Sequence, residues 1–171
     1  ACATDLEEQI RTSTRQQNWT KTLDLLVILR SQQADTYIRG EYDYLTGRVL
    51  AGLGRDDEAL VRFERFTAPA HPLSIPARMA AAQLRFKRGD ARSATELLLP
   101  LLQRQQGAVL KKAARLILNE IEMRPDQDSY QLFQSVRPRL PQRERRRLDA
   151  VGADLLQGSG DVEKAAEKRL E

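Results

Sequence analysis

The chain has 171 residues, of which 30% are charged and 5% aromatic, with a formal net charge of +4 at pH 7. Leu, Ala, Arg, Glu and Gln dominate, and these residues favour helices, whereas no stretch alternates β-branched residues over the length of a strand. No apolar stretch is long enough to span a membrane, and the single cysteine excludes a disulfide within the chain.

The pattern predicts paired helices along the whole chain. The expected pairs are 4–16 with 20–31, 38–53 with 56–68, 75–87 with 91–104, 108–123 with 127–137, and 141–157 with 161–170. Pro100 lies inside one predicted helix and is expected to kink it. The segment Arg137–Pro141 contains two prolines and is expected to form an extended link, since a residue before proline disfavours the helical conformation.

A turn signal recurs along the chain and predicts a repeat architecture. Gly54 and Gly89 are 35 residues apart, and each is followed five residues later by alanine. A third such signal begins at Gly160, a fourth is expected near Pro125, and a fifth lies near Gln17. Five antiparallel helix hairpins fit this spacing, which predicts an all-α solenoid forming one domain over residues 1–171. The alternative is a non-repetitive all-helical bundle.

Each repeat is expected to use the same physical pattern of small and large residues. A glycine in the left-handed conformation ends one helix, an aspartate caps the next, and small residues on both helices allow close approach to a large apolar side chain. In the two clearest repeats these positions are Gly47, Gly54, Asp56, Ala59 and Phe63, and then Ala82, Gly89, Asp90, Ala94 and Leu98.

These positions resemble the tetratricopeptide repeat, although no Trp opens a repeat at the family position. The resemblance implies a superhelix that binds a protein or peptide partner in a concave groove lined by the first helix of each repeat. On that register Met79 is placed on the groove. The other predicted groove residues are Tyr44, Arg48, Gln83, Arg115 and Asn119.

A second resemblance rests on the stretch Glu41-Tyr42-Asp43-Tyr44-Leu45-x-Gly47, on the turn from Gly54 to Phe63, and on His71-Pro72-Leu73-Ser74. Over residues 41–102 the chain is similar to the helical superhelix of soluble lytic transglycosylases. That resemblance implies a non-catalytic scaffold, because the family's catalytic Glu lies in a separate lysozyme-like domain whose Glu-Ser motif is not in this chain. An outer-membrane lipoprotein that regulates cell-wall enzymes would fit the same likeness.

The sequence offers no catalytic, metal or cofactor site. His71 is the only histidine and has neither a cysteine nor a second histidine near it for a metal ion, so a loop-stabilising or solvated role is expected. Glycine-rich phosphate loops are also missing. Carboxylates lie among Lys and Arg on helix faces, as in the pair Glu120 and Arg124 at i and i+4. We therefore expect no enzymatic activity from this chain.

A basic cluster near the C-terminus has two interpretations. Six arginines lie within eleven residues from Arg137 to Arg147, with only Glu144 opposing them. A phosphate-binding patch for nucleic acid, an anionic cell-wall polymer or a lipid surface would use such charges. A solvated helix face would look the same, and aromatic stacking partners are absent nearby. The patch residues are Arg139, Arg143, Arg146 and Arg147.

The ends of the chain suggest its context. Cys2 has the position of a lipid-attachment cysteine of a bacterial lipoprotein, with an incidental thiol as the alternative. Leu170-Glu171 resembles a purification-tag junction, and no polar capping helix follows the last repeat, so a fragment of a longer protein is expected. The sequence thus favours a non-catalytic binding or scaffold module of a bacterial envelope protein, in the periplasm or anchored to the outer membrane, and otherwise cytoplasmic. The alternatives are a helical accessory domain of a peptidoglycan lytic transglycosylase and a basic nucleic-acid-binding adaptor.

Overall fold

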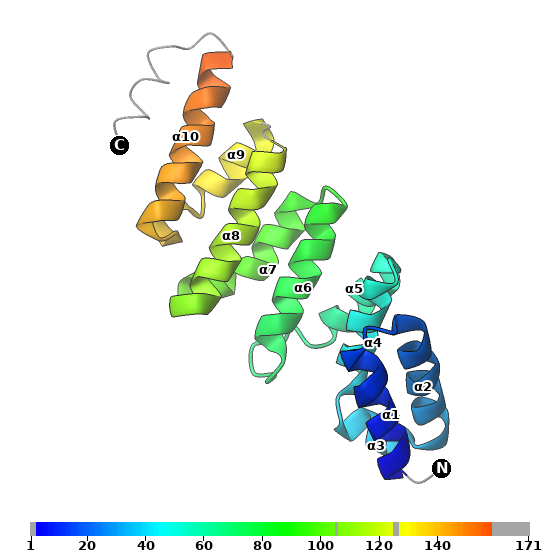
Figure 1. Cartoon of the computed structure of the whole chain (residues 1–171). Helices are drawn as coiled ribbons and strands as arrows, with labels where there is room; N and C mark the ends of the chain where they lie inside the picture. The colour runs from blue at the N-terminus through cyan, green and yellow to red at the C-terminus, as the bar shows by residue number, and fades with distance from the viewer. Residues whose placement is uncertain (1–2, 105, 125–126, 159–171) are drawn as a thin grey trace. The chain divides into compact units, whose positions relative to one another are not determined.

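The computed structural model describes residues 3–104, 106–124 and 127–158, and all regular structure in these ranges is helical (Figure 1). This confirms the prediction of an all-α fold. The chain divides into two compact units, an N-terminal unit of residues 1–80 and a C-terminal unit of residues 81–171. The boundary falls inside one helix, α6 (Ser74–Lys87).

The N-terminal unit is built on the packing of its helices against one another. Its helices are α1 (Ala3–Arg15), α2 (Trp19–Gln32), α3 (Ala34–Arg39), α4 (Tyr42–Gly52) and α5 (Asp56–Glu64). Helix α2 packs on α1 and α4, and α4 packs on α5. The core shared by α1 to α4 is apolar apart from the phenol of Tyr37, and it consists of Leu6, Ile10, Leu25, Leu26, Leu29, Tyr37 and Val49.

The C-terminal unit contains α7 (Ala91–Arg104), α8 (Gly107–Met123), α9 (Gln127–Gln134), the 3-10 helix η1 (Arg137–Arg139) and α10 (Gln142–Gly158). Helix α8 contacts α7, α9 and α10. Arg137 fixes η1 to α10 through two hydrogen bonds to the Asp149 carboxylate, at 2.8 and 2.7 Å. Asp149 is buried, so this bidentate pair compensates a charge that would otherwise be costly in the interior.

The turns between helices follow the predicted chemistry at three places. Gly54 and Gly89 have φ angles of +75° and +81°, the left-handed conformation in which glycine carries no steric penalty. Gln17 takes the same conformation, with φ +54°, at the turn between α1 and α2. The side chain of Asn18 then caps α2 by accepting a hydrogen bond from the Lys21 amide at 3.2 Å.

The predicted aspartate cap is confirmed in one repeat and wrong in the other. The Asp90 side chain accepts a hydrogen bond from the Ser93 amide at 3.1 Å at the start of α7. Asp56 is instead the first residue of α5, and Arg55 holds the N-cap position without a side-chain cap. Both helices begin two residues after the glycine, so the capping position is the residue directly after it, and only Asp90 stands there.

The predicted contacts between small and large residues are present. Ala59 and Ala94 are fully buried, as are Phe63 and Leu98. A Cβ atom placed on Gly47 would lie 3.0 Å from the Phe63 ring, which is closer than packed carbon atoms approach. The small residues are therefore what allows α4 and α5 to lie against each other.

The predicted helix 38–53 is wrong, because the chain forms α3 and α4 with a break between them. Glu41 has a φ angle of +53°, which no helix accommodates. A side chain at Gly40 would overlap the ring of Tyr42, so glycine is required where the chain turns. The second helix of this repeat is also shorter than the predicted 56–68, because α5 ends at Glu64.

The predicted extended link at Arg137–Pro141 is also wrong for most of its length. Arg137–Arg139 form the 3-10 helix, in which Pro138 occupies an early position that needs no amide hydrogen. Only Leu140, the residue before Pro141, is extended, with ψ +145°. Pro100 lies inside α7, which continues through it as one helix, and α9 ends at Gln134 rather than at 137.

Several predicted features lie outside the described residues. These are the turn signals at Pro125 and at Gly160–Ala165, the helix 161–170, Cys2 and the final Leu170-Glu171.

Candidate functional site: a cleft in the N-terminal unit

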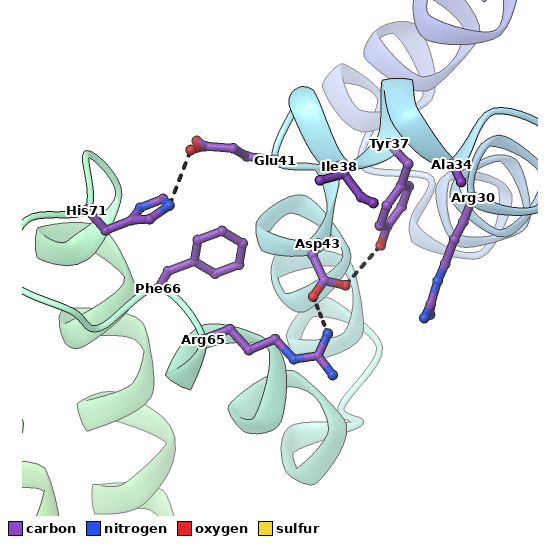
Figure 2. Close-up of a pocket in the computed structure, with 9 residues that line it drawn as sticks. All are labelled: Arg30, Ala34, Tyr37, Ile38, Glu41, Asp43, Arg65, Phe66 and His71. Atoms are coloured by element: carbon purple, nitrogen blue, oxygen red, sulfur yellow. Dashed lines mark hydrogen bonds and ion pairs between the residues drawn. The ribbon is translucent and has the colours of Figure 1, made fainter.

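A cleft of about 550 Å³ opens on the N-terminal unit where α3, the start of α4 and the end of α5 meet (Figure 2). This volume lies in the range of specific ligand sites. The break at Gly40 and Glu41 creates the cleft, because it turns α3 away from the line of α4. The lining residues are Arg30, Ala34, Tyr37, Ile38, Glu41, Asp43, Arg65, Phe66 and His71.

Asp43 is the centre of a hydrogen-bond network in this cleft. Its Oδ1 atom accepts hydrogen bonds from the Arg62 guanidinium at 2.5 Å and from the Tyr37 hydroxyl at 3.1 Å. Its Oδ2 atom accepts one from Arg65 at 2.6 Å. The Asp43 side chain is 17% exposed and that of Arg65 is 54% exposed, so the network has a partly buried carboxylate and one guanidinium that reaches solvent.

The electrostatics of this network keep Asp43 ionised and Tyr37 protonated. Burial alone would raise the pKa of the Asp43 carboxyl, but the charge of Arg62 and hydrogen bonds from Arg65 and Tyr37 outweigh it and hold this pKa below its usual value of 3.8. Burial, together with the neighbouring Asp43 carboxylate, raises the pKa of the Tyr37 phenol. Tyr37 is therefore a hydrogen-bond donor at neutral pH and holds the carboxylate in place.

The far end of the cleft is closed by an ion-pair contact between a loop and the helix break. The Nε2 atom of His71 lies 3.3 Å from the Glu41 carboxylate, and its Nδ1 atom accepts a hydrogen bond from the Leu73 amide at 3.1 Å. Because Nδ1 accepts the loop amide hydrogen, Nε2 is the ring nitrogen left to face the Glu41 carboxylate. The His71 ring also packs edge-on against Phe66, with ring centroids 5.0 Å apart. This bears out the loop-stabilising role predicted for His71.

A second, smaller hollow adjoins the cleft and is lined in part by α2 and α5. It has a volume of about 160 Å³ and shares Arg30 and Tyr37 with the cleft. Its other lining residues come from α2, α4, the turn before α5 and α5, and they are Leu23, Leu26, Val27, Thr46, Leu50, Arg55, Glu58 and Arg62. Because the two hollows share Arg30 and Tyr37, we refer to them together as the Arg30 groove. Arg30 and Tyr37 lie where its two parts meet.

Comparisons of the chain with protein-family models, with curated proteins and with solved structures found no match. The resemblances to the tetratricopeptide repeat and to the transglycosylase superhelix are therefore hypotheses drawn from the residues quoted above. Within the described ranges, no group of three or more His, Cys, Asp or Glu side chains is arranged to hold a metal ion. A search of the same part of the chain found no helix long and apolar enough to cross a membrane.

The predicted concave groove stays a prediction, because its residues belong to different units. Tyr44 and Arg48 belong to the N-terminal unit, and Gln83, Arg115 and Asn119, all exposed, belong to the other. Arg48 is exposed, whereas Tyr44 is half-buried.

The Tyr44 ring lies against Phe63 and Phe66, with centroids 5.5 and 5.8 Å away, so part of it packs within the unit. Met79 is 6% exposed, so its predicted place on a binding surface is wrong and it belongs to the core. Thr46 and Leu50 of α4 line the Arg30 groove, and Arg48 lies between them on the opposite side of the helix, given 100° per residue. The Arg30 groove is therefore a different surface from the predicted one.

The basic cluster is partly neutralised by acidic residues that the fold brings to it. Arg147 donates two hydrogen bonds to one oxygen of Glu122 on α8, at 3.0 and 2.7 Å, and Arg137 pairs with Asp149. Within the run Glu144 is the only acidic residue, and the fold adds Glu122 and Asp149 from outside it. Of the predicted patch, Arg139, Arg143 and Arg146 are exposed.

Sequence reasoning did not identify the Arg30 groove. Asp43 stands inside the quoted stretch Glu41–Gly47, but its partners Arg62 and Arg65 come from the next helix and the turn after it. The sequence pattern that could have indicated this network is the acidic and tyrosine-rich start of α4, followed about twenty residues later by Arg62 and Arg65. The break at Gly40 was also needed to see the cleft, and it was not predicted.

Proposed function

We propose that the chain is a non-catalytic, tetratricopeptide-like helical module that binds an extended segment of a partner protein and acts as a scaffold. The observation that carries this proposal is the Arg30 groove, two adjoining hollows lined by both apolar and charged side chains of four helices. Extended segments of protein are recognised by grooves of this kind, in which apolar contacts give affinity and a few polar groups give register.

The solenoid arrangement of the module is supported by the repeated turn geometry. Left-handed residues at Gln17, Gly54 and Gly89 each stand shortly before a new helix, and the small residues Ala59 and Ala94 are buried at equivalent places. A stack of such hairpins has an extended surface for a partner. The likeness of residues 41–102 to a bacterial envelope superhelix supports a place for the protein in the bacterial cell envelope.

Selection from a displayed random peptide library on the full chain tests the binding function. We expect enrichment of peptides that, once synthesised, bind the chain in a saturable, one-to-one manner without being cleaved. Insoluble peptidoglycan and a DNA duplex serve as comparators at the same salt concentration. Failure to enrich any peptide, together with saturable binding to peptidoglycan or DNA, would contradict the proposal and favour one of the two alternative functions.

Small-angle X-ray scattering tests the solenoid separately. A compact globule of this length has a radius of gyration of about 15–16 Å. A stack of hairpins should give a clearly larger value and an asymmetric distance distribution. A radius at the compact value would exclude the solenoid.

A further inference from the structure

The Arg30 groove carries more positive charge than its own carboxylates neutralise. Arg55 and Glu58, which also line the groove, neutralise each other. Arg62 and Arg65 share the single negative charge of Asp43, which leaves one positive charge in excess. Arg30 adds another, because its guanidinium has no ion pair among the described residues. Glu41 lines the same cleft, but it lies at the other end, against His71. The middle of the groove is therefore a site of positive potential.

The Arg30 guanidinium is positioned by an aromatic ring and not by an ion pair with a carboxylate of the described residues. Its central carbon lies 5.9 Å from the centroid of the Tyr37 ring, within the range of a cation–π contact. Tyr37 is itself fixed, because it is buried and its hydroxyl contacts both Asp43 and Thr46. A guanidinium positioned in this way keeps its planar set of N–H donors directed for an incoming anion.

The same stretch of groove exposes apolar surface. Ile38 is 71% exposed although it is large and aliphatic, and Figure 2 shows its side chain beside Tyr37 on the rim of the cleft. Phe66 also lines the cleft, although only 8% of it is exposed. In the second hollow Val27 is 60% exposed. Apolar side chains therefore lie on both sides of Arg30.

We propose that the Arg30 groove binds an internal segment of a partner protein in which an Asp or Glu side chain neighbours a large apolar residue. The ligand carboxylate lies between Arg30 and Arg65, and the apolar side chain packs on Ile38 and Phe66. This inference rests on the proposed function and names the recognition chemistry of that function. Arg30 lines both hollows, so a bound chain has room on either side of its carboxylate, which favours a carboxylate within a chain over one at a chain end.

An array of decapeptides capped at both ends tests the proposal. Four central positions vary among Glu, Gln, Lys, Leu, Phe and Ala, and the full chain is titrated in solution against the strongest binders. We expect the strongest binders to contain Glu next to Leu or Phe, and we expect a Gln in place of that Glu to weaken them about tenfold, the effect of losing one charge-assisted hydrogen bond.

Arg30→Gln should cause a similar loss of about tenfold, while Arg15→Gln, an exposed arginine of α1 outside the groove, should not. Arg30 and Arg15 are both exposed, and the melting temperatures of Arg30→Gln and Arg15→Gln will show whether each variant keeps the fold. Ile38→Ser should remove the preference for Leu or Phe, whereas Val61→Ser, also an exposed aliphatic position but outside the lining, should retain it.

Three results would overturn the inference. In the first, Gln-containing and Glu-containing peptides bind equally. In the second, only peptides with a free C-terminal carboxylate bind, which would define a chain-end site. In the third, binding is lost in Arg48→Gln and unchanged in Arg30→Gln, which would place the partner on the predicted concave groove. The third result leaves the proposed binding function intact, whereas failure of every library and array peptide to bind removes both.

Discussion

Replacing Ala59 by leucine tests the packing on which the hairpin pattern depends. Ala59 is fully buried in α5. The facing helix α4 is already tightly packed, because a Cβ atom on Gly47 would lie 3.0 Å from the Phe63 ring. Leucine adds three carbon atoms at this contact. Overpacking of this kind costs about 1–3 kcal/mol. At about 2–4 °C per kcal/mol for a chain of this size, the melting temperature should fall by about 2–12 °C.

The matched control is Ala108→Leu, the same change at an exposed position near the start of α8. It should alter stability by no more than about 0.5 kcal/mol. Thermal unfolding of both variants and of the unmodified chain, followed by far-UV circular dichroism at one pH, provides the comparison. Equal melting temperatures for all three would refute the inferred contact between α4 and α5.

Three other changes test separate parts of the structure. Gly89→Ala should lose about 1–2 kcal/mol of stability in denaturant unfolding, since its φ of +81° penalises any Cβ, and an unchanged midpoint would exclude the left-handed turn. Because the folded state lowers the Asp43 pKa, this group's contribution to stability is full above the unfolded pKa of about 3.9 and is lost as pH falls through the folded pKa. Asp43→Asn should therefore be destabilising at pH 6, with a difference from the unmodified chain that shrinks in acid, and a pH-independent difference would count against the network. Replacing Arg143 and Arg146 by Gln should flatten the salt dependence of any weak DNA binding, and tight, sequence-selective binding would contradict a mainly solvated face.

Local signals were sufficient to predict most of the helices and the turns at Gly54 and Gly89. Gly54 and Gly89 mark helix ends because only glycine adopts a left-handed conformation without cost. The burial of Ala59 and Ala94 could be predicted because each lies five residues after one of these glycines. Such features depend on residues within one or two turns of each other, so the sequence displays them directly.

The parts that were not predicted depend on contacts distant in sequence. The break at Gly40 is fixed by the Tyr42 ring and by a strained Glu41, neither of which is visible in helix periodicity. The neutralisation of Arg147 by Glu122 joins residues 25 positions apart. The Arg30 groove likewise needs α2, α3 and α5 to be placed around α4 before Arg30 and Asp43 can be seen as parts of one site.

Hydrogen–deuterium exchange of the full chain with a selected peptide tests the central claim most directly, because it locates the bound segment without any substitution. We predict slower exchange on binding in α3, in the first turn of α4 and around Arg65 to His71, which line the cleft. Exchange in α10 should not change. Protection confined to α10, or no protection in the N-terminal unit, would contradict the account.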